Sequence, residues 1–188
     1  ISLETLLTLY GREGKSRVLD AHQDLLEKNL IVRWADVPSD AEIVFVSHEW
    51  LSWAHPDPQG EQLRVLCCAL QRLRDGHIER VDMDPLHTIA YKHNFSTNST
   101  EWSEMLKKTY LWIDWVSMPQ PSAQKRVCLL DKLRADSAKA IRSIPAYGIM
   151  FDDRHSLTYS LLHHSLLHHS LTHFCITHLL TFTLLTFT

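Results

Sequence analysis

Polar side chains able to take part in catalysis follow directly after two short apolar runs. The runs cover residues 43–46 and 110–113, and each predicts a buried strand. The polar residues that follow them are Ser47, His48, Glu49 and Asp114. In an open α/β sheet the ligand crevice lies beyond the carboxyl ends of the strands, so we expect these side chains at one rim of the sheet. The pattern locates a candidate site but names no reaction.

Two kinds of chemistry suggest themselves near the first strand. A serine beside a histidine suggests a nucleophile and its base. Adjacent residues of an extended strand point to opposite faces, however, so Ser47 and His48 do not form such a pair there. Side chains of the types that bind a divalent cation also gather here, namely His48, Glu49, His55 and Asp57. Such residues more often cap helices and bond neighbouring loops, and we expect no metal site.

Asp114 is the strongest candidate for a functional carboxylate. A carboxylate at the end of a strand can contact a ribose hydroxyl or a cation. The alternative is a structural role, as a helix N-cap or as the ion-pair partner of Lys125 or Arg126. The candidate catalytic residues are therefore Asp114, Glu49 and His48.

Tryptophans flank the candidate site in the sequence. Trp50, Trp53 and Trp115 could stack on a base or on a nicotinamide ring, whereas Trp112 is expected in the core. The candidate ligand-binding residues are Ser47, Trp50, Trp53, His55, Asp57 and Trp115. The five glycines form no phosphate-binding motif, which disfavours a dinucleotide bound as in a Rossmann domain. We expect no cofactor, and NAD enters only as a candidate substrate.

Helical periodicity precedes and follows the two predicted strands. Apolar residues recur at helical spacing in residues 3–10, 18–30, 63–73 and 130–144. Asp57 fits the N-cap of the third helix and Gly76 its end, and Pro145 is expected to end the fourth. An order of strand, helix, strand and helix predicts a parallel sheet.

The charge and cysteine content narrow the class of protein. The 19 basic and 22 acidic residues give a net charge of -3, and no basic cluster occurs, which argues against nucleic acid as a partner. The four cysteines lack zinc-type spacing, which favours a reducing compartment. No charged and apolar leader opens the sequence. These features predict a cytoplasmic protein.

The last part of the chain has a different composition from the rest. Residues 155–188 contain no charged side chain and repeat with a period of five. Such a period gives neither a helix nor a strand a lasting apolar face, so we expect a disordered tail or the product of a gene-model error. Residues 174–188 are too short and too rich in threonine for a membrane span, and we expect no membrane partner.

Several motifs together resemble a known group of domains. They occupy residues 44–50, 55–57, 110–114, 119–120 and 140–147. In order and spacing they resemble the Toll/interleukin-1-receptor-like (TIR-like) domains of protists, which are related in pattern to fungal heterokaryon-incompatibility (HET) domains. The resemblance covers residues 28–147 and implies a flavodoxin-like parallel sheet flanked by helices, with the C-terminal part of the domain missing after Tyr147.

The resemblance also implies a function in signalling or in self/non-self responses. We expect a protein-interaction module whose partners are other proteins, including further copies of the chain. The alternative is an NAD nucleosidase, because some TIR-like domains cleave NAD with a glutamate on a helix after the third strand. No residue matches that glutamate, and Glu49 has the right chemistry in a different element. In this alternative Asp114 contacts the ribose, Trp50 or Trp53 stacks on the leaving base, and Ser47 and His48 line the pocket.

These observations divide the chain into three parts. Residues 1–33 form a helical lead-in, residues 34–154 a partial α/β domain, and residues 155–188 the low-complexity tail. The candidate site falls entirely within the second part.

Overall fold

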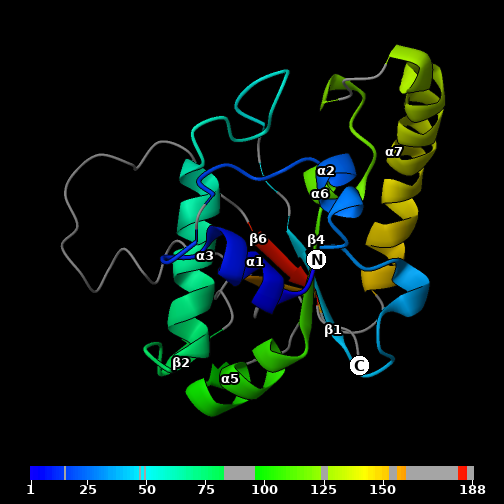
Figure 1. Ribbon diagram of the computed structural model, residues 1–188. Coiled ribbons are helices and arrows are strands. Elements are labelled where there is room, and N and C mark those ends of the chain that lie inside the picture. The colour runs from blue at the N-terminus through cyan, green and yellow to red at the C-terminus, as the bar shows by residue number, and fades with distance from the viewer. Residues whose placement is uncertain are drawn as a thin grey trace.

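Figure 1 shows the computed structural model of the chain, which describes residues 1–14, 16–46, 48, 50–82, 96–123, 127–152, 156–159 and 182–185. The helices and strands are, in chain order, α1 (Leu3–Tyr10), α2 (His22–Glu27), η1 (Trp34–Asp36), β1 (Glu42–Val46), α3 (Glu61–Arg74), β2 (Arg80–Asp82), β3 (Ser96–Asn98), α5 (Ser99–Lys107), β4 (Thr109–Ile113), α6 (Asp114–Ser117), η2 (Pro121–Ala123), η3 (Val127–Leu129), α7 (Leu130–Asp152), β5 (Ser156–Tyr159) and β6 (Phe182–Leu185). None of the helices in these ranges is long and apolar enough to cross a membrane.

The two predicted strands form a small parallel sheet flanked by helices (Figure 1). β1 and β4 pair in a register that sets Glu42 opposite Thr109 and Val46 opposite Ile113. Both strands therefore end at the same edge, as the sequence predicts. The described sheet has these two strands alone, so the finer expectation of a flavodoxin-like sheet stays a prediction.

One face of this sheet lies in the main hydrophobic core. The core face consists of Val44, Val46, Leu111 and Ile113, all of them buried. It packs in one cluster with side chains of α1, α3 and α5, among them Leu6, Leu70 and Trp102. Each such side chain contributes roughly 1.5–3 kcal/mol on burial, so this face supplies much of the stability of the fold.

The opposite face of the sheet is covered less well. The outer face consists of Ile43, Phe45, Tyr110 and Trp112, which cluster with Val37. The rings of Phe45 and Trp112 stack with centroids 4.6 Å apart and an interplanar angle of 14°. Ile43 is buried, while the three aromatic side chains are half-buried. The side chains of the core face are thus fully buried, whereas the three aromatic side chains of the outer face are only partly covered.

The first residue of the chain is tied to the free edge of β4. The Ile1 amino group donates to the Leu111 carbonyl over 3.0 Å, and the Leu111 N–H donates to the Ile1 carbonyl over 2.7 Å. Burial lowers the pKa of this amino group from 8.0 to about 6. Ser2 then caps α1, because its hydroxyl oxygen accepts from the Thr5 N–H at 3.1 Å.

Helix α3 begins at a backbone crossing that only glycine allows. Gly60 has a φ of +69°, and a Cβ there would lie 1.8 Å from the Arg17 carbonyl oxygen. The helix ends before Gly76, whose φ of +73° closes it as the sequence predicts. The apolar stripe of the predicted helix, from Leu63 to Leu73, faces the core.

Two helical expectations need correction. The periodic stretch 18–30 forms a helix only at α2, from His22 to Glu27. The last predicted helix, α7, does not end at Pro145 but continues to Asp152. A proline removes one backbone hydrogen bond and bends a helix, and here the helix continues beyond it.

The low-complexity tail contains two short described strands. β5 and β6 pair as an antiparallel hairpin, with Ser156 opposite Leu185, and β6 lies beside β1. The remainder of the tail lies outside the described residues. The expectation that the tail is disordered and dispensable stays a prediction, which amide hydrogen exchange can test.

Candidate functional site

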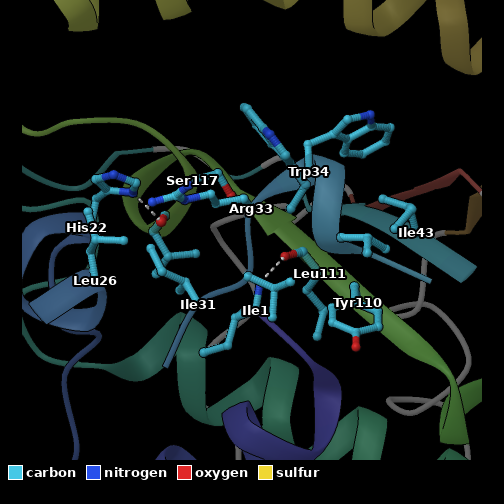
Figure 2. A pocket seen from close by; sticks show the side chains of 14 residues that line it. Ile1, His22, Leu26, Ile31, Arg33, Trp34, Ile43, Tyr110, Leu111 and Ser117 are labelled. Carbon is cyan, nitrogen blue, oxygen red and sulfur yellow. Dashed lines mark hydrogen bonds between the residues drawn. The ribbon is translucent and has the colours of Figure 1, made fainter. Parts of the chain in front are cut away.

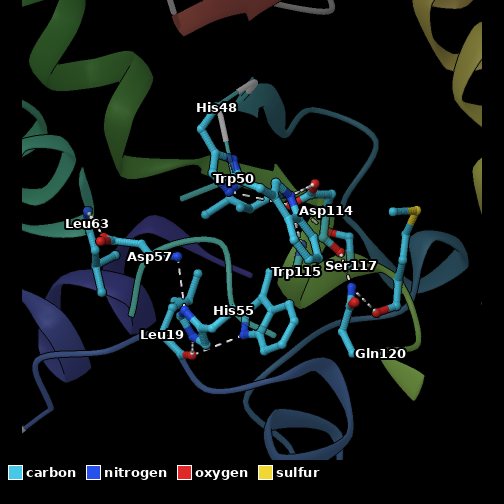
Figure 3. Close-up of polar contacts among 12 residues, drawn as sticks. Leu19, His48, Trp50, His55, Asp57, Leu63, Asp114, Trp115, Ser117 and Gln120 are labelled. Carbon is cyan, nitrogen blue, oxygen red and sulfur yellow. Dashed lines mark hydrogen bonds and ion pairs between the residues drawn. The ribbon is translucent and has the colours of Figure 1, made fainter. Parts of the chain in front are cut away.

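Asp114 lies at the end of β4, where it opens the short helix α6 (Figure 3). Its Oδ2 accepts from the indole Nε1–H of Trp50 at 2.8 Å, and its Oδ1 accepts from the Trp115 backbone N–H at 2.6 Å. The Nε2 atom of His48 lies 3.7 Å from Oδ1. Both carboxylate oxygens are therefore engaged by groups of the chain itself.

The predicted rim is confirmed for the residues that the structure describes. His48 and Asp114 follow different strands and meet at the same edge of the sheet. Ser47 and Glu49, also expected there, lie outside the described residues. The alternative ion-pair partners of Asp114, Lys125 and Arg126, lie outside them as well.

A glutamine that the sequence analysis did not single out holds the turn after α6. The Gln120 side-chain amide donates to the Asp114 carbonyl at 3.1 Å and to the Met118 carbonyl at 3.0 Å. The backbone carbonyl of Gln120 accepts from the side-chain amide of Gln23 at 2.7 Å. The sequence contained a sign of this residue in the motif at residues 119–120, one of those that carry the resemblance. Gln120 fixes the backbone that carries Asp114.

His55 is bonded through both of its ring nitrogens. Its Nδ1 accepts from the Asp57 N–H at 2.9 Å, so the proton must be on Nε2, which donates to the Leu19 carbonyl at 3.0 Å. The Trp115 indole N–H donates to the same carbonyl at 3.1 Å. The neutral ring of His55 thus joins the loop after β1 to the segment before α2, with no nitrogen left for a metal or a proton transfer.

Asp57 stabilises the start of α3 as predicted, although the N-cap position itself belongs to Gly60. Its Oδ1 accepts from the Glu61 N–H at 3.0 Å and its Oδ2 from the Leu63 N–H at 2.9 Å. The carboxylate is buried at the start of α3 and satisfies two backbone donors of the first turn. Among the described residues no group of three or more metal-binding side chains occurs, so the structure offers no assembled cation site there.

The candidate tryptophans occupy three different environments. Trp115 is buried, so its predicted part in binding a ligand is replaced by a part in the core. Trp50 packs edge-on against Trp115, with ring centroids 5.6 Å apart, and leaves 38% of its surface exposed. Trp53 projects from the loop after β1 with 99% of its surface exposed. The three candidate tryptophans thus consist of one lone exposed ring and two rings packed on each other.

A cavity of about 390 Å³ lies elsewhere, against the outer face of the sheet (Figure 2). Its walls come from α2, from the segment around η1 and from β1, β4 and α6. Of the residues singled out in the sequence only Trp112 lines it, and Arg33 and Trp34 at its rim were missed. The alternation of large side chains at Ile43, Tyr110 and Trp112 was the signal available for this surface.

Comparison with known proteins finds no match for this chain. No family model, no curated protein and no solved structure matches it. The resemblance to TIR-like and HET domains therefore rests on the motifs of the sequence and stays a hypothesis.

Proposed function

We propose that the domain is a protein-interaction module of the signalling type, and that the loop carrying Trp53 makes its principal contact. The observation that supports this is a contrast within the candidate site. The polar groups of His55, Asp57 and Asp114 are engaged by hydrogen bonds of the chain, whereas Trp53 is 99% exposed. Among the described residues of the site, the surface most open to another molecule is the apolar ring of Trp53.

The loop that carries Trp53 is held in shape by its own hydrogen bonds. The Leu51 N–H donates to the Pro56 carbonyl at 2.8 Å. The Ser52 hydroxyl donates to the His55 carbonyl at 2.9 Å and accepts from the His55 N–H at 3.1 Å. A tryptophan on an ordered loop loses little conformational entropy on binding, and tryptophan is enriched among the residues that dominate interface energies.

The enzymatic alternative requires the Asp114 carboxylate to contact the substrate. Cleavage of NAD at the ribose needs a carboxylate that stabilises the positive charge growing on the sugar. In this structure the Asp114 oxygens accept from Trp50 and from the backbone of Trp115. An NAD nucleosidase would have to release one of these bonds or use another carboxylate.

Site-specific cross-linking tests the interaction module. Photoreactive benzoylphenylalanine replaces Trp53 in one variant and Lys107, an exposed residue of α5, in a matched control. Irradiation in extract of the native cells should give discrete protein adducts from position 53 that position 107 does not give. An adduct of twice the chain mass would identify a second copy as the partner. Equal labelling from both positions would contradict the proposal.

An assay for nicotinamide release tests the alternative. We expect the purified chain to release no nicotinamide from NAD above background. If the chain does release nicotinamide, and Asp114→Asn abolishes the release while keeping its thermal transition, the chain is an enzyme and the proposed interaction module is wrong.

A further inference from the structure

We propose that the cavity against the outer face of the sheet binds a small aromatic carboxylate, with the carboxylate on Arg33 and the ring against the sheet. The inference does not depend on the proposed function, because none of the candidate site residues lines this cavity. It rests on the size of the cavity, on its walls and on the placement of its charge.

The size and the walls of the cavity suit a small apolar body. Its volume of about 390 Å³ lies toward the lower end of the range of about 300–1,000 Å³ typical of small-molecule sites. Ile43, Tyr110 and Trp112 form its floor on the sheet. Trp34 stands at the rim with 57% of its surface exposed. A flat ring placed between Trp34 and the floor would gain aromatic contact on both sides.

Apart from the Ile1 amino group, which donates to the Leu111 carbonyl, the charge of the cavity is concentrated at one place. Arg33 is the one charged side chain among the described residues that line it; it is exposed, and none of the ion pairs among the described residues includes it. A guanidinium presents two parallel N–H groups that match a carboxylate. In Figure 2 the Arg33 side chain lies near Ser117 and His22, away from Ile43. The cavity therefore has a cationic end and an apolar end.

The neighbour of Arg33 at this end is fixed and does not compete for its charge. The Nδ1 of His22 lies 2.9 Å from the Val116 carbonyl, which only accepts, so the ring donates a proton there. The described lining of the cavity thus contains no Asp or Glu that would neutralise Arg33. An anion with an apolar body is the ligand that this arrangement fits.

Calorimetric titration of the full chain with 2-naphthoate tests the proposal. We expect one molecule to bind per chain, at least tenfold more tightly than the uncharged 2-naphthalenemethanol. Arg33→Met keeps the length of the side chain and removes its charge, so it should weaken 2-naphthoate at least tenfold and leave 2-naphthalenemethanol unchanged. Arg74→Met, on α3 beside Asp75, is the matched control and should change neither.

A second variant tests the location independently of the charge. Leu26 lines the cavity from α2 and is 47% exposed, so Leu26→Trp should fill part of the space without unfolding the chain. Binding of both compounds should then be lost. If that variant loses its thermal transition, Val32→Trp, at a 42% exposed position of the same cavity, takes its place. No saturable binding at millimolar 2-naphthoate, or binding that survives Arg33→Met unchanged, would overturn the proposal.

Discussion

The two faces of the β1–β4 sheet come from the same ten residues and have different fates. On the core face, Val44, Val46, Leu111 and Ile113 are 2–4% exposed beneath α1, α3 and α5. On the outer face, three large aromatic side chains stay half-buried, and two of them, Tyr110 and Trp112, line a cavity. The strands are apolar on both sides, so their pattern alone could not distinguish the faces. The elements that cover each side decide which becomes core and which becomes surface.

The largest test of this difference replaces neighbouring residues of β4. Leu111→Ala should lower the free energy of unfolding by about 3 kcal/mol, because it leaves a cavity in closed packing. Tyr110→Ala, on the outer face, should lower it by only about 1 kcal/mol, because water already reaches that side chain. Chemical denaturation of the two variants measures both values.

The test lies in which of the two variants loses more free energy of unfolding. A loss from Tyr110→Ala equal to that from Leu111→Ala would show that the outer face is as closed as the core face. The slopes of the denaturation curves should agree, since a changed slope would report a change in the unfolded state instead.

The next test concerns Ile1, which belongs to the main core and also lines the cavity. Its amino group has a pKa of about 6 in the folded chain against 8.0 when exposed, because burial disfavours the charged form. The unfolded chain therefore binds more protons between these values, and stability falls as the pH drops from 8 to 6. We expect this group to account for about 2 kcal/mol of the loss.

A chain with one added alanine before Ile1 is the control for this pH dependence. The buried amine then becomes an amide, which does not titrate. The midpoint temperature of thermal unfolding should fall less steeply between pH 8 and pH 6 for the extended chain than for the original chain. Identical pH profiles would show that the amino group is not buried in solution.

The smallest expected effect concerns the helix that covers the core face. Asp57→Ala removes the carboxylate that accepts from Glu61 and Leu63, and should lower the free energy of unfolding by about 1.5 kcal/mol. Asp75→Ala, at the exposed end of α3, is the matched control and should cost less than about 0.5 kcal/mol. An equal loss in both variants would contradict the capping role.

Local patterns in the sequence predicted the two parallel strands and the core helix α3. The runs before His48 and Asp114 gave two parallel strands with a shared edge, and the stripe from Leu63 to Leu73 gave a core helix. Asp57 was predicted at the N-cap of that helix; Gly60 holds that position instead, and the Asp57 carboxylate, three residues further back, accepts from the first turn. These features depend on residues close in sequence, where periodicity and turn chemistry act directly.

Long-range packing set the features that the sequence did not predict. Trp115 is buried because its indole reaches the Leu19 carbonyl, a contact between residues 96 positions apart. The cavity beside Arg33 and Trp34 joins elements from five parts of the chain. Such contacts join residues of the site that are far apart in the sequence. No local spacing in the sequence predicts these contacts.

The exposure of Trp53 gives the folded chain two optically separate populations of tryptophan. Trp53 is 99% exposed and Trp102 is 1% exposed, among six tryptophans in all. An indole in water emits at longer wavelength and is reached by aqueous quenchers such as iodide, whereas a core indole is shielded from them. The red edge of the emission spectrum therefore reports on the exposed rings, Trp53 in the loop after β1 and Trp34 at η1, and the blue edge reports on the core.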